Sequence, residues 1–78
     1  MSLFAKGDAV KLNPAVLEDL TQKRNRHLLV RVIKENDEGI IREQDTERSG
    51  PEAFYYWVRF SYFAILLSEF NLMKVVSS

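Results

Sequence analysis

The sequence predicts a small, mainly β domain, a barrel of five to six short antiparallel strands with a long early loop and one or two short helical turns. The chain of 78 residues forms one domain, 1–78, which is too short to cover an open sheet with a second layer. Short apolar and aromatic runs alternate with turn residues. Helical periodicity is confined to residues 14–20. Curling the sheet into a barrel would bury its inner face and remove most of its edges.

The first strand is expected at residues 9–12, after a Gly-Asp turn. Alternation along it places Val10 and Leu12 on a buried face. Asn13 and Pro14 then stop the strand, because Asn is a favoured helix N-cap and Pro suits the first helical position. Residues 14–21 are therefore expected to form a helical turn within a loop that continues to residue 27.

Further strands are expected where β-branched, aromatic and apolar residues cluster, at 28–34, 39–42, 54–60, 63–67 and 72–76. Residues 35–39, which are polar and end in glycine, are expected to connect two of these strands as a hairpin. Residues 68–71 are expected to form a single helical turn before the last strand. Strands 63–67 and 72–76 carry apolar residues on both faces, and this surplus predicts a homodimer.

The segment 54–60, FYYWVRF, is the strongest strand signal, with five aromatic residues among seven. A period of two places Phe54, Tyr56, Val58 and Phe60 toward the core, and Tyr55, Trp57 and Arg59 on the outer face. Tyr, Trp and Arg dominate the energetics of protein interfaces, so this outer face is expected to bind a partner. The alternative is that the early loop folds over it, with Val16, Leu17 and Leu20 as a lid. A one-residue shift in register would also turn Trp57 inward.

Charge is balanced overall, with eleven basic and eleven acidic residues, so no global field attracts DNA or an anionic membrane. Residues 1–34 nevertheless carry +4, residues 35–52 carry −5, and residues 53–78 carry +1. The basic cluster at residues 23–27 contributes Arg24 and Arg26, which are expected to edge the aromatic surface. Together with aromatic stacking, the basic loop 23–31 also supports an alternative function, a KOW- or OB-like nucleic-acid-binding domain. The acidic stretch is interpreted as a hairpin tip and a solvated loop.

Several classes of site are not expected. The chain has no cysteine and one histidine, which disfavours thiolate and zinc sites, and its three glycines are too scattered to cradle a phosphate. We therefore expect no metal, no cofactor and no catalytic residues, since an active site would need an oligomer interface.

The longest uncharged run, residues 60–68, has nine residues and is too short to span a bilayer. No signal peptide is visible at the N-terminus, so a cytoplasmic protein is expected.

Four segments carry a resemblance to a known group, namely KGDAVKL at 6–12, EGII at 38–41, YWVRF at 56–60 and LLSEFNLMKV at 66–75. Their order resembles the SH3-like small β-barrels, including the KOW-type family, in which a helical turn leads into the last strand. Length and layout are also similar to barrel accessory proteins of photosynthetic electron-transfer complexes, such as the small barrel protein of photosystem I and the variable chain of ferredoxin–thioredoxin reductase. The resemblance implies docking onto a larger complex without chemistry of its own.

The expected function is therefore a non-catalytic protein-interaction or accessory module. Its partner-binding residues are expected to be Tyr55, Trp57 and Arg59, edged by Arg24 and Arg26. A protein partner is expected, with nucleic acid as the alternative.

Overall fold

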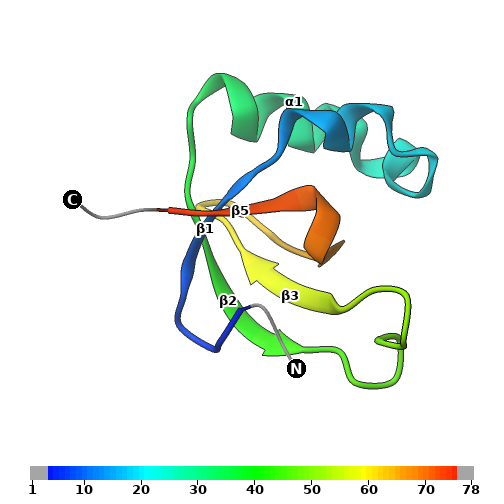
Figure 1. Ribbon diagram of the computed structural model, residues 1–78. Helices are drawn as coiled ribbons and strands as arrows, with labels where there is room; N and C mark the ends of the chain where they lie inside the picture. The colour runs from blue at the N-terminus through cyan, green and yellow to red at the C-terminus, as the bar shows by residue number, and fades with distance from the viewer. Residues whose placement is uncertain (1–3, 76–78) are drawn as a thin grey trace.

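The computed structural model describes residues 4–75 and is built on one five-stranded antiparallel sheet. The strands pair in the order β4-β3-β2-β1-β5, so the first strand lies between the second and the last (Figure 1). Within the described residues β4 and β5 form the two edges, and the pairing is not closed into a ring. The predicted mainly β class is confirmed. The strands are β1 (Ala9–Leu12), β2 (Gly39–Gln44), β3 (Tyr55–Arg59), β4 (Ala64–Ser68) and β5 (Leu72–Lys74).

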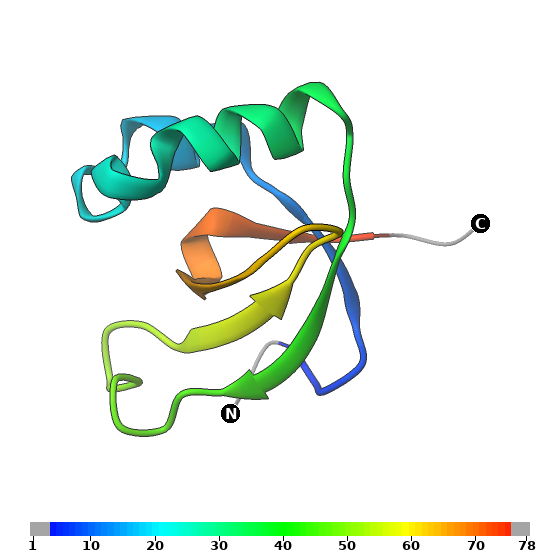
Figure 2. The same ribbon diagram turned by 180° about the vertical axis from the view of Figure 1, so that it is seen from behind.

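A helical segment connects β1 to β2 and lies across one end of the curved sheet (Figures 1 and 2). It consists of the 3-10 helices η1 (Pro14–Glu18) and η2 (Leu20–Asn25) and the α-helix α1 (Arg26–Lys34). The predicted helical start at Asn13 is confirmed, because its side-chain oxygen accepts a hydrogen bond of 3.1 Å from the N–H of Ala15. Most of the expected early loop is therefore helical.

The predicted strand at 28–34 is wrong, since this segment is helix α1. In a strand, the alternation of side chains would have placed Arg31 on the same face as the apolar residues Leu29 and Ile33. The helical spacing i, i+3, i+4 instead groups Leu29, Val32 and Ile33, and leaves Arg31 exposed. Leu29 and Val32 are buried in the core. The β-branched composition of LLVRVIK was misleading because tertiary burial of one stripe outweighs the modest helix penalty of Val and Ile.

The predicted hairpin at 35–39 is also wrong, because these residues end α1 and lead into β2. Asn36 has φ of 52°, the left-handed conformation that terminates many helices. The N–H groups of Asn36 and Asp37 donate to the carbonyls of Ile33 and Val32, at 3.1 and 3.0 Å, which is a Schellman motif. The side chain of Arg31 contacts Glu35 at 3.2 Å on the helix surface.

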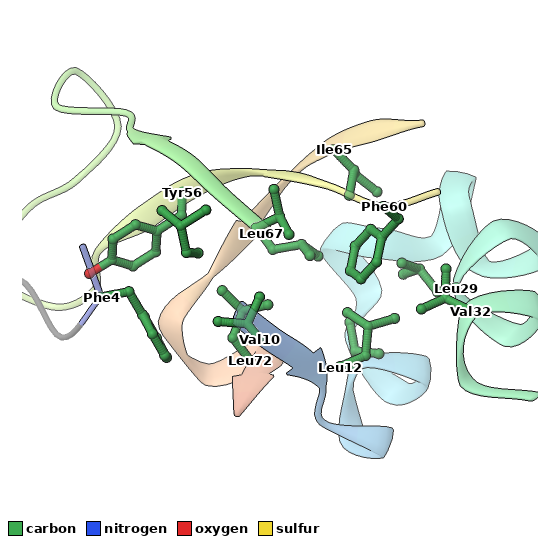
Figure 3. Close-up of a cluster of buried hydrophobic side chains, with 13 residues drawn as sticks. Phe4, Val10, Leu12, Leu29, Val32, Tyr56, Phe60, Ile65, Leu67 and Leu72 are labelled. Atoms are coloured by element: carbon green, nitrogen blue, oxygen red, sulfur yellow. The ribbon is translucent and has the colours of Figure 1, made fainter. Parts of the chain in front are cut away.

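The core is a single elongated cluster between the concave face of the sheet and the helical segment (Figure 3). At one end the rings of Phe4 and Tyr56 meet edge to face, with centroids 5.3 Å apart. At the other end Leu29 and Val32 of α1 pack in the same cluster. The predicted inward residues Val10, Leu12, Tyr56, Val58 and Phe60 are buried, and Phe54 is half-buried.

The predicted turn before the last strand is the 3-10 helix η3 (Glu69–Asn71). The side-chain oxygen of Asn71 accepts hydrogen bonds from the N–H and the hydroxyl of Ser68, at 3.0 and 3.1 Å. Both residues are buried. This local network fixes the corner between β4 and β5.

Candidate functional site

The two faces of β3 lie in different surroundings. Tyr56 and Val58 are fully buried, whereas Trp57, between them in sequence, is 37% exposed on the convex face of the sheet. In the strand register Trp57 lies opposite Glu43 of β2 and Leu66 of β4. Tyr55 is half-buried and Arg59 is exposed on the same face. The outer face of β3 thus carries the aromatic–arginine trio that alternation predicts.

A groove of about 640 Å³ lies beside Trp57. The sheet contributes Tyr55, Trp57 and Leu66, which give it an aromatic and apolar lining. Helix η2 contributes Thr21, Gln22 and Asn25, and the loop between β2 and β3 contributes Arg48. The groove therefore combines an apolar surface with hydrogen-bonding groups and one cation, a combination typical of interface pockets that hold an anchor residue. We call it the aromatic groove.

The wall formed by η2 is fixed to the sheet through Gln22. Its side-chain nitrogen donates a hydrogen bond of 3.2 Å to the carbonyl of Leu66, and Gln22 is itself buried. Leu66 lies on β4, which is an edge strand of the sheet within the described residues. The Gln22 side chain therefore satisfies one edge carbonyl and also sets the position of the groove wall.

Asp19 anchors the start of η2. Its carboxylate accepts hydrogen bonds from the hydroxyl and the N–H of Thr21, at 2.6 and 2.9 Å, and from the side-chain amide of Asn71, at 3.0 Å. The Thr21 hydroxyl and the Asn71 amide lower the pKa of Asp19, assisted by the Thr21 N–H and opposed by partial burial. This carboxylate ties η2 to the corner between β4 and β5.

The early segment flanks Trp57 instead of covering it. Val16 is buried in the core and Leu17 packs against it, whereas Leu20 is 85% exposed. None of these three residues lines the aromatic groove. The lid considered from the sequence is therefore absent from the described residues, and η2 supplies a polar wall in its place.

Arg59 lines a second groove, of about 490 Å³, further along β3. Lys6, Arg42 and Arg59 bring positive charge to it, and Ile40 and Glu43 lie among them. Lys6 reaches this position through a turn at Gly7, which has φ of 94° and donates a backbone hydrogen bond of 2.8 Å to the carbonyl of Ile41. We call this site the cationic groove.

Arg24 and Arg26 lie on the surface of the helical segment, in η2 and at the first residue of α1. Both are exposed, and neither lines the aromatic or the cationic groove. The structure thus brings Tyr55, Trp57 and Arg59 to one face and does not place the two predicted arginines beside them.

No local pattern in the sequence marks Gln22 or Asn25 as groove residues, because their positions depend on how η2 packs. Arg42 and Lys6 had a weak signal, since Arg42 ends the predicted strand 39–42 and Lys6 directly precedes the predicted Gly-Asp turn. Among residues 4–75, no three His, Asp or Glu side chains cluster closely enough to hold a metal ion. Nor does any helix in this part of the chain have the length and apolar character needed to cross a bilayer.

Comparisons with protein-family models, with curated proteins and with solved structures found no match to this chain.

Proposed function

We propose that this protein is a non-catalytic interaction or accessory module that docks a protein partner through the outer face of β3. The observation that carries the proposal is the 37% exposure of Trp57 in an open groove, one residue from the fully buried Tyr56. A partly exposed indole with a neighbouring phenol offers a large contact area at a small entropy cost. The fixed polar wall of η2 adds hydrogen-bonding partners without requiring the site to reorganise.

We also propose that the fold is an SH3-like small barrel in which the early loop has become helical. The position of β1 between β2 and β5 supports this proposal, because it joins the two ends of the chain as a small barrel requires. The 3-10 helix η3, directly before the last strand, is a second supporting feature. Such barrels host many functions, so the function is argued from the groove alone.

Selection from a random dodecapeptide display library tests the docking function. The full chain serves as bait, without counter-selection, and the affinity of the selected peptides for the Trp57→Ala variant is measured afterwards. Because Trp57 is the only tryptophan, its fluorescence reports binding in the groove. We expect selected peptides to shift Trp57 emission and to bind the Trp57→Ala variant about tenfold more weakly or worse, as for a hot-spot residue.

The matched control is Tyr62→Ala. Tyr62 is also an exposed aromatic residue, but it does not line the aromatic groove. Its substitution should leave peptide affinity unchanged. A library that yields no binder, or binders indifferent to Trp57→Ala, contradicts the proposed function.

Nucleic-acid binding is the second candidate. It is supported by the position of the basic segment, since η2 forms one wall of the aromatic groove and also carries Arg24. Phosphate contacts from this segment would accompany base stacking on Trp57. Single-stranded dT12 titrated at low and high salt tests it, because binding that depends on Arg24 and Arg26 and weakens steeply with salt would favour this candidate.

A further inference from the structure

The cationic groove gathers three basic side chains that form no ion pair within the described part of the chain. Lys6, Arg42 and Arg59 are all exposed. The ion pairs found within residues 4–75 join Arg31 to Glu35 and Arg48 to Asp45, so none involves this trio. Glu43 also lines the groove and offsets part of this charge, which leaves an excess of positive charge. Like charges placed together on a folded surface repel one another, and an anionic ligand would relieve that repulsion.

An irregularity in β2 builds this groove. The register between β2 and β3 shifts between Ile41 and Glu43, so that Arg42 is the extra residue of a β-bulge. Arg42 and Glu43 are consequently both exposed, although strict alternation would bury one of them. Ile40 lies directly opposite Arg59 and is 45% exposed. The bulge therefore adds a second guanidinium beside Arg59 and next to an exposed apolar side chain.

We propose that the cationic groove binds carboxylate side chains of an acidic, apolar peptide segment. This inference rests on the proposed docking function and names the chemistry of the partner. The guanidinium groups of Arg42 and Arg59 can each form bidentate hydrogen bonds with a carboxylate, and Lys6 adds a third donor group. Ile40 offers apolar contact to a side chain next to the acidic residue.

The spacing along β3 allows one segment to reach both grooves. Trp57 and Arg59 lie on the same face, two residues apart, which is roughly 6–7 Å along a strand. In an extended partner segment, side chains on one face repeat at the same interval. An apolar residue over Trp57 would thus be followed, two positions later, by an acidic residue near Arg59.

Charge and composition favour a peptide over a nucleic acid here. Among the described residues, no aromatic side chain lines the cationic groove, so it offers no stacking surface. Glu43 also lines it, and its carboxylate would repel a phosphate backbone. A partner segment with a few separated carboxylates avoids Glu43 more easily than a continuous polyanion does.

A titration followed by 15N NMR of the full chain tests the inference directly. The probe is the acetylated, amidated hexapeptide Leu-Ser-Asp-Ser-Asp-Ser, in which one face of the extended chain carries Leu and, two positions later, Asp. The control is the same peptide with Lys in place of Asp. We expect the acidic peptide to shift the amide signals of Arg42 and Arg59. The Arg42→Gln/Arg59→Gln variant should bind it about three- to tenfold more weakly. Raising the salt concentration should also weaken binding.

Two further variants separate local from general charge effects. Arg24→Gln/Arg26→Gln removes the same number of charges away from both grooves and should leave the affinity unchanged. Glu43→Gln removes the one acidic side chain found in the groove among the described residues and should tighten binding, a gain that misfolding cannot produce.

The inference is overturned if the acidic peptide does not bind, if the lysine peptide binds equally well, or if Arg42→Gln/Arg59→Gln has no effect. It is also overturned if dT12 binds more tightly than the peptide through the same two arginines. The Trp57→Ala variant distinguishes failure of the proposed docking function from failure of the inference about the cationic groove. If this variant binds the acidic peptide as well as the wild type does, the peptide ligand of the cationic groove stands and the role of Trp57 in docking fails.

Discussion

Tyr56 and Trp57 are neighbours in sequence with opposite roles. The Tyr56 ring is fully buried and packs edge to face on Phe4, whereas the indole of Trp57 forms part of an open groove. Because side chains alternate along a strand, one residue can serve stability while the next serves binding. Stability and docking can therefore be separated by single substitutions in β3.

Alanine substitutions at these two positions should have very different costs. Tyr56→Ala should lower the free energy of unfolding by about 3–5 kcal/mol, enough to unfold most of so small a domain. Trp57→Ala should lower it less, by about 2 kcal/mol, because Trp57 is 37% exposed in the folded protein and Tyr56 is fully buried. Urea unfolding followed by circular dichroism measures both. Equal losses for the two variants would show that Trp57 is part of the core.

Asp19 should make the domain sensitive to acid. Its pKa is lowered in the folded protein, mainly by the Thr21 hydroxyl and then by Asn71. The unfolded chain therefore takes up the proton first, and the stabilisation is complete above about pH 4 and lost as the pH falls through the folded pKa. Asp19→Ala should lower stability at pH 7 by about 1 kcal/mol, the usual value of an N-cap.

A series of stability measurements from pH 7 down through the acid range checks this prediction. The difference between wild type and Asp19→Ala should shrink as the pH falls through the lowered folded pKa, because the wild-type carboxylate then takes up its proton. Glu18→Ala, at the neighbouring carboxylate, serves as the control and should change little at either pH. A pH-independent loss for Asp19→Ala would mean that the hydrogen bonds of the charged carboxylate are not what holds η2.

Strand β2 depends on close approach of its first residue to β3. A Cβ placed on Gly39 would lie 2.5 Å from Cγ1 of Val58 and 2.8 Å from Cε1 of Phe60. Gly39→Ala must therefore displace two core side chains and should cost about 1–3 kcal/mol. Gly50→Ala is the matched control, because a Cβ there meets no described atom within 4 Å. Thermal unfolding of both variants tests the prediction, and similar melting temperatures would contradict it.

The strands were readable from the sequence because their signals are local. Alternation in AVKL and FYYWVRF predicted both the strands and the buried faces of β1 and β3. The Asn-Pro start of η1 was readable because a cap depends on adjacent residues. Helix α1 was not predicted, because its β-branched composition masks the helical spacing of Leu29, Val32 and Ile33. The β-bulge at Arg42 has no signal in the sequence, since it depends on the pairing of two strands.

At the scale of the whole molecule, charge segregation along the chain does not predict charge on the surface. Arg42 comes from the most acidic stretch of the sequence, residues 35–52, yet it lies with Lys6 and Arg59 in the cationic groove. Folding joins cations from three segments and separates them from most of the acidic residues. The aromatic half of the site was predictable from one strand, whereas the cationic half required the tertiary structure.

The apolar surplus that predicted a homodimer is partly explained by burial within the chain. Ile65, Leu67 and Leu72 are in the core, and Leu66 is half-buried in the aromatic groove. Met73 is 42% exposed on the edge strand β5, and Val76 lies outside the described residues. A homodimer stays a prediction, and sedimentation equilibrium over a range of concentrations tests it.

Acrylamide quenching of Trp57 fluorescence, with and without a saturating library-selected peptide, tests the central claim most directly. Trp57 is the only tryptophan, so the signal reports on the aromatic groove alone. We expect acrylamide to quench Trp57 in the free protein, because the residue is 37% exposed, and to quench it several times less in the complex. Quenching that is equally strong with and without bound peptide would show that partners bind elsewhere, and would contradict docking on the outer face of β3.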